Sequence, residues 1–269
     1  MTTKQPPHLA ARSVTIGYKE RTICRDLSFA VQPGSFTVII GPNACGKSTL
    51  LRALARLLTP LKGCVLLDGE DIARLPTRSV ARRLGLLPQT FAIPDGITVS
   101  ELVGRGRYPH QSFLRQWSAA DEAAVRAAMA DTDIAELADQ PVDTLSGGQR
   151  QRAWVAMALA QETPLLLLDE PTTFLDIAHQ IGLLDLFETL NRKGRTIVAV
   201  LHDLNQAARY ASHLVAMKDG KIVAEGPPAT IVTPEIIKSA FDLECVVIPD
   251  PVTGSPLIVP TRHPKGKFR

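Results

Sequence analysis

A glycine-bearing loop that begins at Gly41 has the residue types and spacing of a phosphate-binding site. Gly41, Gly46, Lys47 and Ser48 form the pattern Gly-x4-Gly-Lys-Ser. In such a loop, successive backbone N–H groups converge on the β-phosphate, and the helix that follows adds its positive N-terminal end. The Lys47 ammonium would contact the β- and γ-phosphate oxygens, and the Ser48 hydroxyl can ligate Mg²⁺. The predicted nucleotide-binding residues are Gly41, Pro42, Asn43, Ala44, Cys45, Gly46, Lys47, Ser48 and Thr49.

The loop pattern does not fix the two small residues Ala44 and Cys45. Ala44 stands where many such loops have a third glycine. Because a Cβ atom disfavours positive φ, we expect a right-handed or extended backbone at Ala44. Cys45 lies among the phosphate-binding amides. A small residue without a chemical role is the simpler interpretation of Cys45, although modification of its thiol should block nucleotide binding.

Two carboxylates and a histidine follow buried strands further along the chain. Asp169 and Glu170 come directly after Leu165–Leu168. A carboxylate at such a strand end can hold Mg²⁺, and the next one can polarise an attacking water as general base. His202 follows the apolar segment Thr196–Leu201, one helix and one strand later, where a donor could contact the γ-phosphate. Taken alone, the carboxylates could mark an exposed strand end, and the histidine could be structural.

A second predicted anion-binding motif, Leu145-Ser-Gly-Gly-Gln149, lies about a hundred residues after the phosphate loop. Gly147 and Gly148 let the backbone approach a phosphate closely, and Ser146 stands where a helix N-cap would be. The predicted helix Gln151–Gln161 directs its positive end outward. Two such motifs make sense if Ser146, Gly147, Gly148 and Gln149 of one molecule close on the nucleotide of another.

The elements that must position these groups alternate between strands and helices. Phe36–Ile40 is apolar throughout, as in a strand buried on both faces, and runs directly into the phosphate loop. Leucines then recur at helical spacing from Leu50 to Leu58. The alternation after Pro164 predicts a parallel sheet with crossover helices. The further predicted elements are strands at Ser13–Ile16, Asp26–Val31, Leu165–Leu168, Thr196–Leu201 and His213–Met217 and helices at Ile177–Arg192 and Leu204–Ala211.

Local patterns also predict helix starts and hairpins. Thr98, Ser118 and Ser146 each precede an acidic residue or glutamine by three positions, which is typical of a helix start. They fall within about 92–163, which we interpret as a helical insert. Asp219-Gly220 and Thr253-Gly254 predict hairpin turns. The hairpins would join His213–Met217 to Lys221–Ala224 and Cys245–Ile248 to Leu257–Val259.

Composition excludes several classes of protein. The chain has 269 residues, of which 45% are hydrophobic and 21% charged, with 30 Lys+Arg against 27 Asp+Glu. These values disfavour a disordered, collagen-like or disulfide-stapled chain. No apolar run approaches the roughly 18–20 residues of a membrane span, and Met1–Arg12 does not read as a secretory signal. The four cysteines lack a Cys-x-x-Cys pair, so we expect reduced thiols.

The sequence resembles the ATP-binding subunits of ABC transporters over essentially its whole length. The matching residues are the loop Gly41–Thr49, Gln89 in Leu-Leu-Pro-Gln, Leu145–Gln149, Leu165–Glu170, Asp176 and His202. The resemblance implies an α/β fold of the RecA-like P-loop NTPase type, with a three-layer core, an antiparallel β subdomain and a helical subdomain at about 92–163. It places the nucleotide-binding domain at residues 8–245 and a C-terminal extension with a β-hairpin and basic tail at 246–269.

The same resemblance implies roles for individual residues. An aromatic ring upstream of the loop would stack on adenine; Tyr18 is the candidate, and a turn or core tyrosine is the alternative. Glu170 would be the general base, while Lys47 and His202 would offset charge on the γ-phosphoryl group. Gln89 would sense the phosphate and join Ser48 and Asp169 around Mg²⁺. Asp176 would contribute to the nucleotide site of a head-to-tail dimer.

A closer resemblance is to the ATPases of ferric-siderophore importers, relatives of the haem and vitamin B12 systems. It rests on Gly104–His110, Thr172–Gln180, Asp250–Gly254 and the Ala44-Cys45 pair. The segment Thr172-Thr-Phe-Leu-Asp176 departs from the commoner Ser-Ala-Leu-Asp form, although Asp176 is kept.

The resemblance implies an ATP-hydrolysing subunit, with ATP and Mg²⁺ as cofactors, that powers ferric-siderophore import. Its partners would be a second copy of the chain, integral membrane permease subunits and, indirectly, a substrate-binding protein, and it would lie peripherally on the cytoplasmic side of the inner membrane. The alternatives are a soluble ribosome-associated ABC ATPase and an importer of haem or cobalamin.

Charge is unevenly distributed along the chain. Residues 74–115 hold seven arginines against two acids, a local excess of +5. This segment is either a solvated basic face or a docking surface for the membrane partner. Nucleic-acid binding is not expected, because aromatic residues interleave it only sparsely.

Overall fold

The computed structural model describes residues 8–18, 21–89, 96–111 and 117–261. Parts of the basic segment, at 90–95 and 112–116, and the basic tail at 262–269 lie outside these ranges. The chain forms two compact units, one made of Met1–Ala73 with Val198–Arg269 and the other of Arg74–Ile197. Within the described ranges, no helix combines the length and apolarity that a membrane crossing requires.

An antiparallel sheet opens the first unit. Its strand order is β2-β1-β4-β5, with β1 at Leu9–Tyr18, β2 at Arg21–Val31, β4 at Lys62–Leu67 and β5 at Glu70–Asp71. Along β2, buried Cys24, Leu27, Phe29 and Val31 are separated by more exposed residues, because alternate side chains of a strand point to opposite faces. One face of this sheet therefore carries its core.

The strand that precedes the phosphate loop belongs to a second sheet, of six strands, whose first four follow the order β10-β9-β3-β8. Here β3 is Phe36–Ile40, β8 is Thr196–Val200, β9 is His213–Lys218 and β10 is Lys221–Gly226. All five residues of β3 are buried, as its apolar sequence predicts. It pairs in parallel with β9, and β9 pairs antiparallel with β10 across the predicted Asp219-Gly220 turn.

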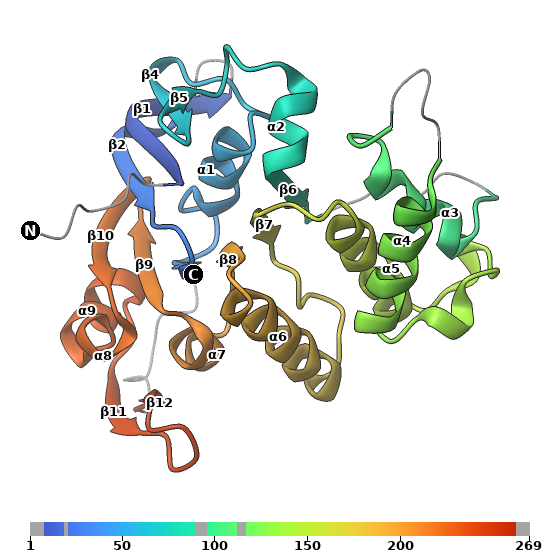
Figure 1. Cartoon of the computed structure of the whole chain (residues 1–269). Coiled ribbons are helices and arrows are strands. Elements are labelled where there is room, and N and C mark those ends of the chain that lie inside the picture. The colour runs from blue at the N-terminus through green and yellow to red at the C-terminus, as the bar shows by residue number, and fades with distance from the viewer. Residues whose placement is uncertain (1–7, 19–20, 90–95, 112–116, 262–269) are drawn as a thin grey trace, which may run out of the picture. The chain divides into compact units, whose positions relative to one another are not determined.

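Short helices and a hairpin complete the first unit. They are α1 (Lys47–Leu54), α7 (Leu204–Tyr210), α8 (Pro228–Ile231), α9 (Pro234–Phe241), β11 (Cys245–Pro249) and β12 (Pro256–Pro260). The β11–β12 hairpin forms as predicted, and Figure 1 shows it below α7. Asn205 on α7 binds it at both polar groups of Ile258, accepting from the N–H at 2.8 Å and donating to the oxygen at 3.3 Å.

Helix α1 ends earlier than the leucine spacing predicts. The expected pattern ran to Leu58, but α1 stops at Leu54. Arg56 adopts φ 61°, and the N–H of Leu57 bonds to the oxygen of Arg52 at 2.8 Å. A left-handed residue followed by this long-range bond is the Schellman form of helix end, which outweighs the apolar spacing.

The second unit contains two parallel strands and two helices near them in sequence. Strand β6 (Leu84–Leu87) pairs in parallel with β7 (Leu165–Asp169), and all five residues of β7 are buried. Helix α2 (Thr77–Arg83) leads into β6, and α6 (Ile177–Arg192) has the predicted bounds.

Three further helices pack against one another in the second unit: α3 (Val99–Gly104), α4 (Ala119–Asp131) and α5 (Gly147–Ala160) (Figure 1). Short 3-10 turns at Arg105–Arg107, Ala135–Leu137 and Val142–Thr144 connect them. Thr98, Ser118 and Ser146 each form a full capping box, so the three predicted N-caps are confirmed. Helix α5 begins at Gly147, earlier than the predicted Gln151, because its cap is Ser146.

Candidate nucleotide site

The phosphate loop connects β3 to α1 and is closed around its own lysine. The Lys47 ammonium donates to the oxygens of Gly41 and Pro42 at 2.8 and 2.9 Å. Only 5% of Lys47 is exposed. Gly41 and Gly46 have φ 156° and 108°, values that side chains rarely adopt. The loop therefore holds a buried positive charge inside a ring of its own backbone.

Ala44 corrects one expectation. Its φ is 60°, so it takes the left-handed conformation that a glycine would have taken. For an alanine this costs roughly 1–2 kcal/mol. An anion-binding loop needs neighbouring residues of opposite hand so that consecutive N–H groups point inward. Because the bonds of Lys47 and a 3.4 Å bond from Cys45 N–H to Pro42 O fix the chain on both sides, this requirement prevails over residue preference.

Two buried thiols lie at the loop, that of Cys24 on β2 and that of Cys45 within the loop itself. Burial raises the pKa of Cys24 to about 11, with a smaller contribution from Cys45. Burial is also the main cause that raises the pKa of Cys45, against the opposing charge of Lys47. A raised pKa lowers the fraction of reactive thiolate, so Cys45 acts here as a small packing residue.

Tyr18 and His202 lie in the same unit as the loop. Tyr18 ends β1 with 43% of its surface exposed, and its hydroxyl accepts from Arg52 on α1 at 3.3 Å. The N–H of Leu201 bonds to the oxygen of Ile39 at 3.3 Å, which puts exposed His202 beside the strand end that enters the loop. Both placements fit the expected roles, which stay predictions.

The carboxylates lie in the second unit, where a contact absent from the sequence predictions joins Glu170 to Gln89. Asp169 ends β7 and is 2% exposed. The Gln89 Nε2 atom donates to Glu170 Oε2 at 2.7 Å. The parallel register explains this pairing, because Leu87 is opposite Leu168 and each partner lies two residues further on. Glu170 has φ 55°, so its carboxylate is carried on a strained turn.

The segment Leu145–Gln149, the signature segment, caps helix α5, and Gln151 just after it contacts the residues that follow Glu170. The Ser146 hydroxyl accepts from Gln149 N–H at 3.2 Å, and the Gln149 side chain accepts from Ser146 N–H at 2.9 Å. Gln151 is buried and donates to the oxygen of Pro171 at 2.9 Å. A Cβ built on Gly148 would lie 3.3 Å from Leu175, so this glycine permits close packing there.

Asp176 is the N-cap of α6. It accepts from His179 N–H at 2.9 Å and contacts the His179 ring at 2.8 Å, and these bonds lower its pKa. Next to it, Phe174 and Ile177 are 79% and 76% exposed. This loop is therefore apolar as well as polar at its surface.

The residues expected around Mg²⁺ offer a hydroxyl, an amide oxygen and a carboxylate. These are hard oxygen donors of the kind that Mg²⁺ takes alongside phosphate oxygens, so the donor set of Ser48, Gln89 and Asp169 fits the ion. Among the described residues, no cluster of three or more His, Cys, Asp or Glu side chains forms an all-protein metal cage. Such a site would depend on the nucleotide for its remaining ligands.

Comparison with known proteins identifies the fold and the family. Residues 24–173 match the ABC transporter family. The chain is 58% identical over 259 residues to the ferric enterobactin transport ATP-binding protein FepC of Escherichia coli K12, covering 96% of each. It is 52% identical to the achromobactin transport ATP-binding protein CbrD of Dickeya dadantii, covering 97% of each.

Solved structures agree with these sequence matches. An inward-facing ABC transporter described as of metal-chelate type has a TM-score of 0.81 and 27% identity, with 96% of this chain and 98% of that chain covered. The dimeric cassette MJ0796 has a TM-score of 0.74 and 27% identity, with 81% and 98% covered. The predicted P-loop α/β fold with antiparallel β and helical subdomains is confirmed. The chain belongs to the ABC transporter family, as one of its ATP-hydrolysing subunits.

Proposed function

We propose that this subunit powers the import of a ferric siderophore through separate membrane permease subunits, at the cytoplasmic side of the inner membrane. The observation that carries the proposal is the 58% identity with a ferric enterobactin transport protein over 96% of both chains. A cobalamin import protein of Halobacterium salinarum reaches 42% over 88% of this chain and 60% of that protein. The difference favours an iron chelate over cobalamin as the cargo.

In the proposed reaction, the loop at 41–49 holds the ATP phosphates and Tyr18 stacks on the adenine. Bound Mg²⁺, held by Ser48, Gln89 and Asp169, would neutralise charge on the phosphate oxygens. Glu170 accepts a proton from the attacking water as general base. Lys47 and His202 stabilise charge that develops on the γ-phosphoryl group.

The Gln89–Glu170 hydrogen bond would hold the proposed catalytic base in a less reactive state before hydrolysis. While Gln89 donates to Glu170 at 2.7 Å, one carboxylate oxygen is occupied and less available to a water. Movement of Gln89 would release that oxygen. Gln89 would thus couple the catalytic base to its own position just after the end of β6.

The ATP-binding subunits of this family work as pairs, and the exposed loop at Asp176 fits such an arrangement. In the proposed dimer, the nucleotide of one copy is covered by Ser146, Gly147, Gly148 and Gln149 of the other, with Asp176 nearby. The N–H groups at the start of α5 would face the γ-phosphate, since an anion there interacts favourably with a helix N-terminus. ATP then stabilises the closed pair, and hydrolysis removes the bridging contacts.

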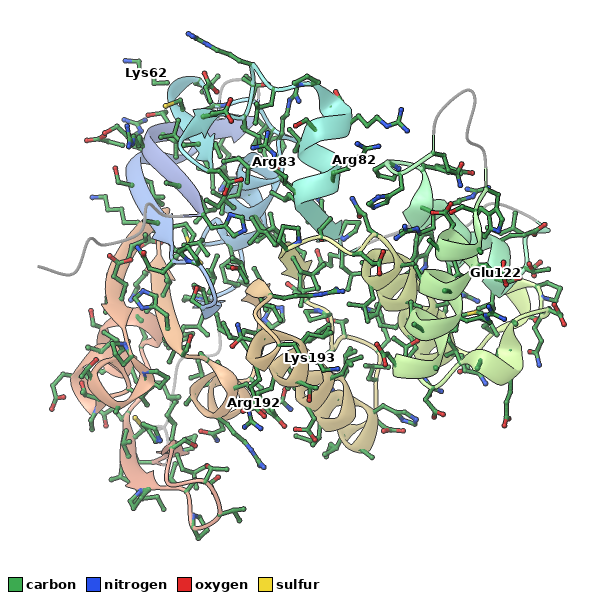
Figure 2. All side chains as sticks on the ribbon, in the orientation of Figure 1. Lys62, Arg82, Arg83, Glu122, Arg192 and Lys193 are labelled. Atoms are coloured by element: carbon green, nitrogen blue, oxygen red, sulfur yellow. The ribbon has the colours of Figure 1, made fainter. Side chains whose placement is uncertain are left out.

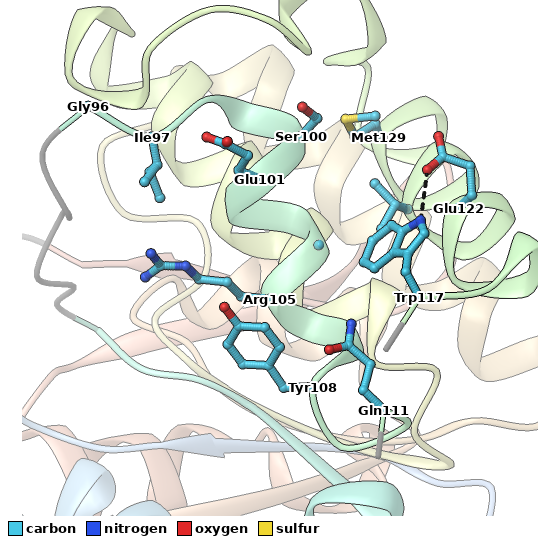
Figure 3. Close-up of a pocket in the computed structure, with 12 residues that line it drawn as sticks. Gly96, Ile97, Ser100, Glu101, Arg105, Tyr108, Gln111, Trp117, Glu122 and Met129 are labelled. Atoms are coloured by element: carbon cyan, nitrogen blue, oxygen red, sulfur yellow. Dashed lines mark hydrogen bonds between the residues drawn. The ribbon is translucent and has the colours of Figure 1, made fainter. Parts of the chain in front are cut away.

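A pocket in the helical part of the second unit is the proposed docking site for the permease. It has a volume of about 720 Å³ and is lined by Ser100, Glu101, Arg105, Tyr108, Trp117 and Met129, among others (Figure 3). Tyr108 and Trp117 are 61% and 48% exposed, and Trp117 donates to Glu122 at 3.3 Å. Aromatic, arginine and methionine side chains are enriched at protein interfaces.

Three of the seven arginines in the basic segment bind other parts of the chain. Figure 2 labels Arg82 and Arg83 on α2, and Arg78 and Arg82 both donate to the oxygen of Pro109 at 2.8 Å. Arg83 contacts Ser79 at 3.0 Å. Because these cations bind the chain itself, the pocket is a better candidate for docking than a diffuse basic face.

The test is ATPase activity of the reconstituted complex with permease and substrate-binding proteins. We expect stimulation when the binding protein carries a ferric siderophore, and none with haem or cobalamin. Trp117→Ala should abolish the stimulation and leave the basal rate of the isolated subunit unchanged. Stimulation by a non-iron ligand alone would overturn the cargo assignment, and co-purification with ribosomes in place of membrane subunits would overturn the transport role.

A further inference from the structure

The turn between β9 and β10 lies directly beneath the phosphate loop. The N–H of Gly220 donates to the oxygen of Cys45 at 2.9 Å. At the other end of the loop, a Cβ on Gly41 would overlap the carbonyl oxygen of Met217 on β9. The end of β9 and its turn therefore contact the loop at both Gly41 and Cys45.

Two glycines allow this approach. A Cβ on Gly220 would overlap the carbonyl oxygen of Ile23 on β2, and its φ is 74°. A Cβ on Gly46 would lie 2.9 Å from the Cys24 sulfur and 3.1 Å from Ile23. The 45–46 peptide, β2 and the β9–β10 turn thus meet in a space that admits no further carbon atom.

The hydrogen bond from Gly220 to Cys45 fixes the direction of a whole peptide group. In a planar trans peptide, the C=O of one residue and the N–H of the next point in opposite directions. Because Gly220 binds the oxygen of Cys45, the N–H of Gly46 must point to the other side, away from the turn. In an anion-binding loop, consecutive N–H groups point to the inner side, where a phosphate would be bound, and the Gly46 N–H would be one of them.

We infer that Gly220 is a positioning residue for nucleotide binding: its N–H holds the Cys45–Gly46 peptide so that the Gly46 N–H faces the β-phosphate before nucleotide arrives. This rests on the proposed role of the loop at 41–49. Without the bond, the peptide could rotate and turn the Cys45 oxygen toward the phosphate, which would repel it. ATP and ADP both carry a β-phosphate, so affinity for both depends on Gly220 equally.

The chain supplies a matched control in Gly254, in the turn of the β11–β12 hairpin. Its φ is 72°, nearly that of Gly220, and nothing lies within 4 Å of a Cβ built there. Alanine at either position suffers the same left-handed strain, but only Gly220→Ala also displaces the turn from Ile23 and Cys45. Any difference in nucleotide binding between the two variants reports the contact with the loop.

The experiment measures dissociation constants for ATP and ADP with the full chain, well below the melting temperature of every variant. We expect Gly220→Ala to weaken both nucleotides by roughly tenfold or more, as expected for a lost charge-assisted donor. Gly254→Ala should remain within about twofold of the unsubstituted chain. Equal affinities for Gly220→Ala and Gly254→Ala would overturn the inference.

Amide hydrogen exchange keeps the inference testable if Gly220→Ala does not fold. In the unsubstituted chain, the Gly220 N–H should exchange far more slowly than an open peptide, and ADP should slow it further. Exchange at the open-peptide rate, or no response to ADP, would overturn the inference. A Lys47→Ala variant distinguishes failure of this inference from failure of the proposed function. If the unsubstituted chain binds no ATP, or Lys47→Ala binds ATP equally well, the proposed function fails and not the role of Gly220.

Discussion

At the scale of single residues, the two carboxylates that follow β7 have different surroundings and therefore different expected roles. Asp169 is almost fully buried at the strand end, whereas Glu170 is partly exposed and bonded to Gln89. Replacing Glu170 by Gln keeps the size of the side chain but removes its ability to accept a proton. We expect turnover to fall at least about 10²-fold while ATP affinity is retained. Phosphate release and nucleotide binding measured in parallel check this, and unchanged turnover would remove Glu170 from the role of base.

The same residues show where sequence reasoning succeeds and where it stops. The phosphate loop, Ser146 and the Asp169-Glu170 pair can be predicted because each pattern lies in a short, contiguous stretch of sequence. The left-handed Ala44 was predicted wrongly, since a residue preference of roughly 1–2 kcal/mol yields to the surrounding bonds. The Gln89–Glu170 bond was missed, because it depends on the pairing of two strands about eighty residues apart.

At the scale of elements, one buried arginine joins three parts of the helical bundle. Arg107 is 4% exposed and bonds to Asp121 at 2.8 Å, to the oxygen of Ala160 at 2.7 Å and to Glu162 at 2.6 Å. It thus ties the 3-10 turn after α3 to the start of α4 and the end of α5. We call Arg107 with its partners Asp121, Ala160 and Glu162 the Arg107 clamp. The sequence predicts the N-caps of these helices because a cap is local, but it does not predict the clamp, whose residues are far apart in the chain.

Replacing Arg107 by Ala should therefore destabilise the fold strongly. The change leaves Asp121 buried without its cation, which typically costs about 3–5 kcal/mol. Exposed Arg126 on α4 is the control, and Arg126→Ala should change the free energy of unfolding by less than about 0.5 kcal/mol. Chemical denaturation of the two variants makes the comparison. Equal stabilities would show that the clamp contributes nothing.

The clamp also predicts a pH dependence. The hydrogen bond from the Ser118 side chain lowers the pKa of Asp121 below the ordinary value of 3.8. The bond and charge of Arg107 lower it further. A carboxyl whose pKa is lower in the folded state stabilises the fold above the unfolded pKa, and that contribution disappears as pH falls through the folded pKa. Asp121→Asn should thus be less stable than the unsubstituted chain at pH 7, with the gap narrowing below about pH 4. A gap independent of pH would contradict this.

At the scale of the whole molecule, the proposed ATP-dependent pair would bury the surface around Asp176, and Phe174 is the test of that surface. Phe174 is 79% exposed and lies beside the signature, where its Cβ is 3.9 Å from a Cβ built on Gly147. An aromatic side chain this exposed gains stability when a second copy covers it, about 1.5–3 kcal/mol if burial is complete. Each of the two symmetric sites would contribute, so the effect of one substitution is counted twice.

Phe174→Ser in the Glu170→Gln background should thus weaken ATP-dependent dimerisation by roughly a hundredfold or more, measured by sedimentation with saturating ATP. Val252→Ser is the control, because Val252 is 82% exposed and apolar but lies in the β11–β12 turn. Its dimerisation should be unchanged. Monomeric ATP affinity of Phe174→Ser should also be unchanged, since Phe174 would touch only the second copy. Equal dimerisation of the two serine variants would mean that this surface stays exposed in the closed pair, and the signature would then have to meet the nucleotide by a different approach.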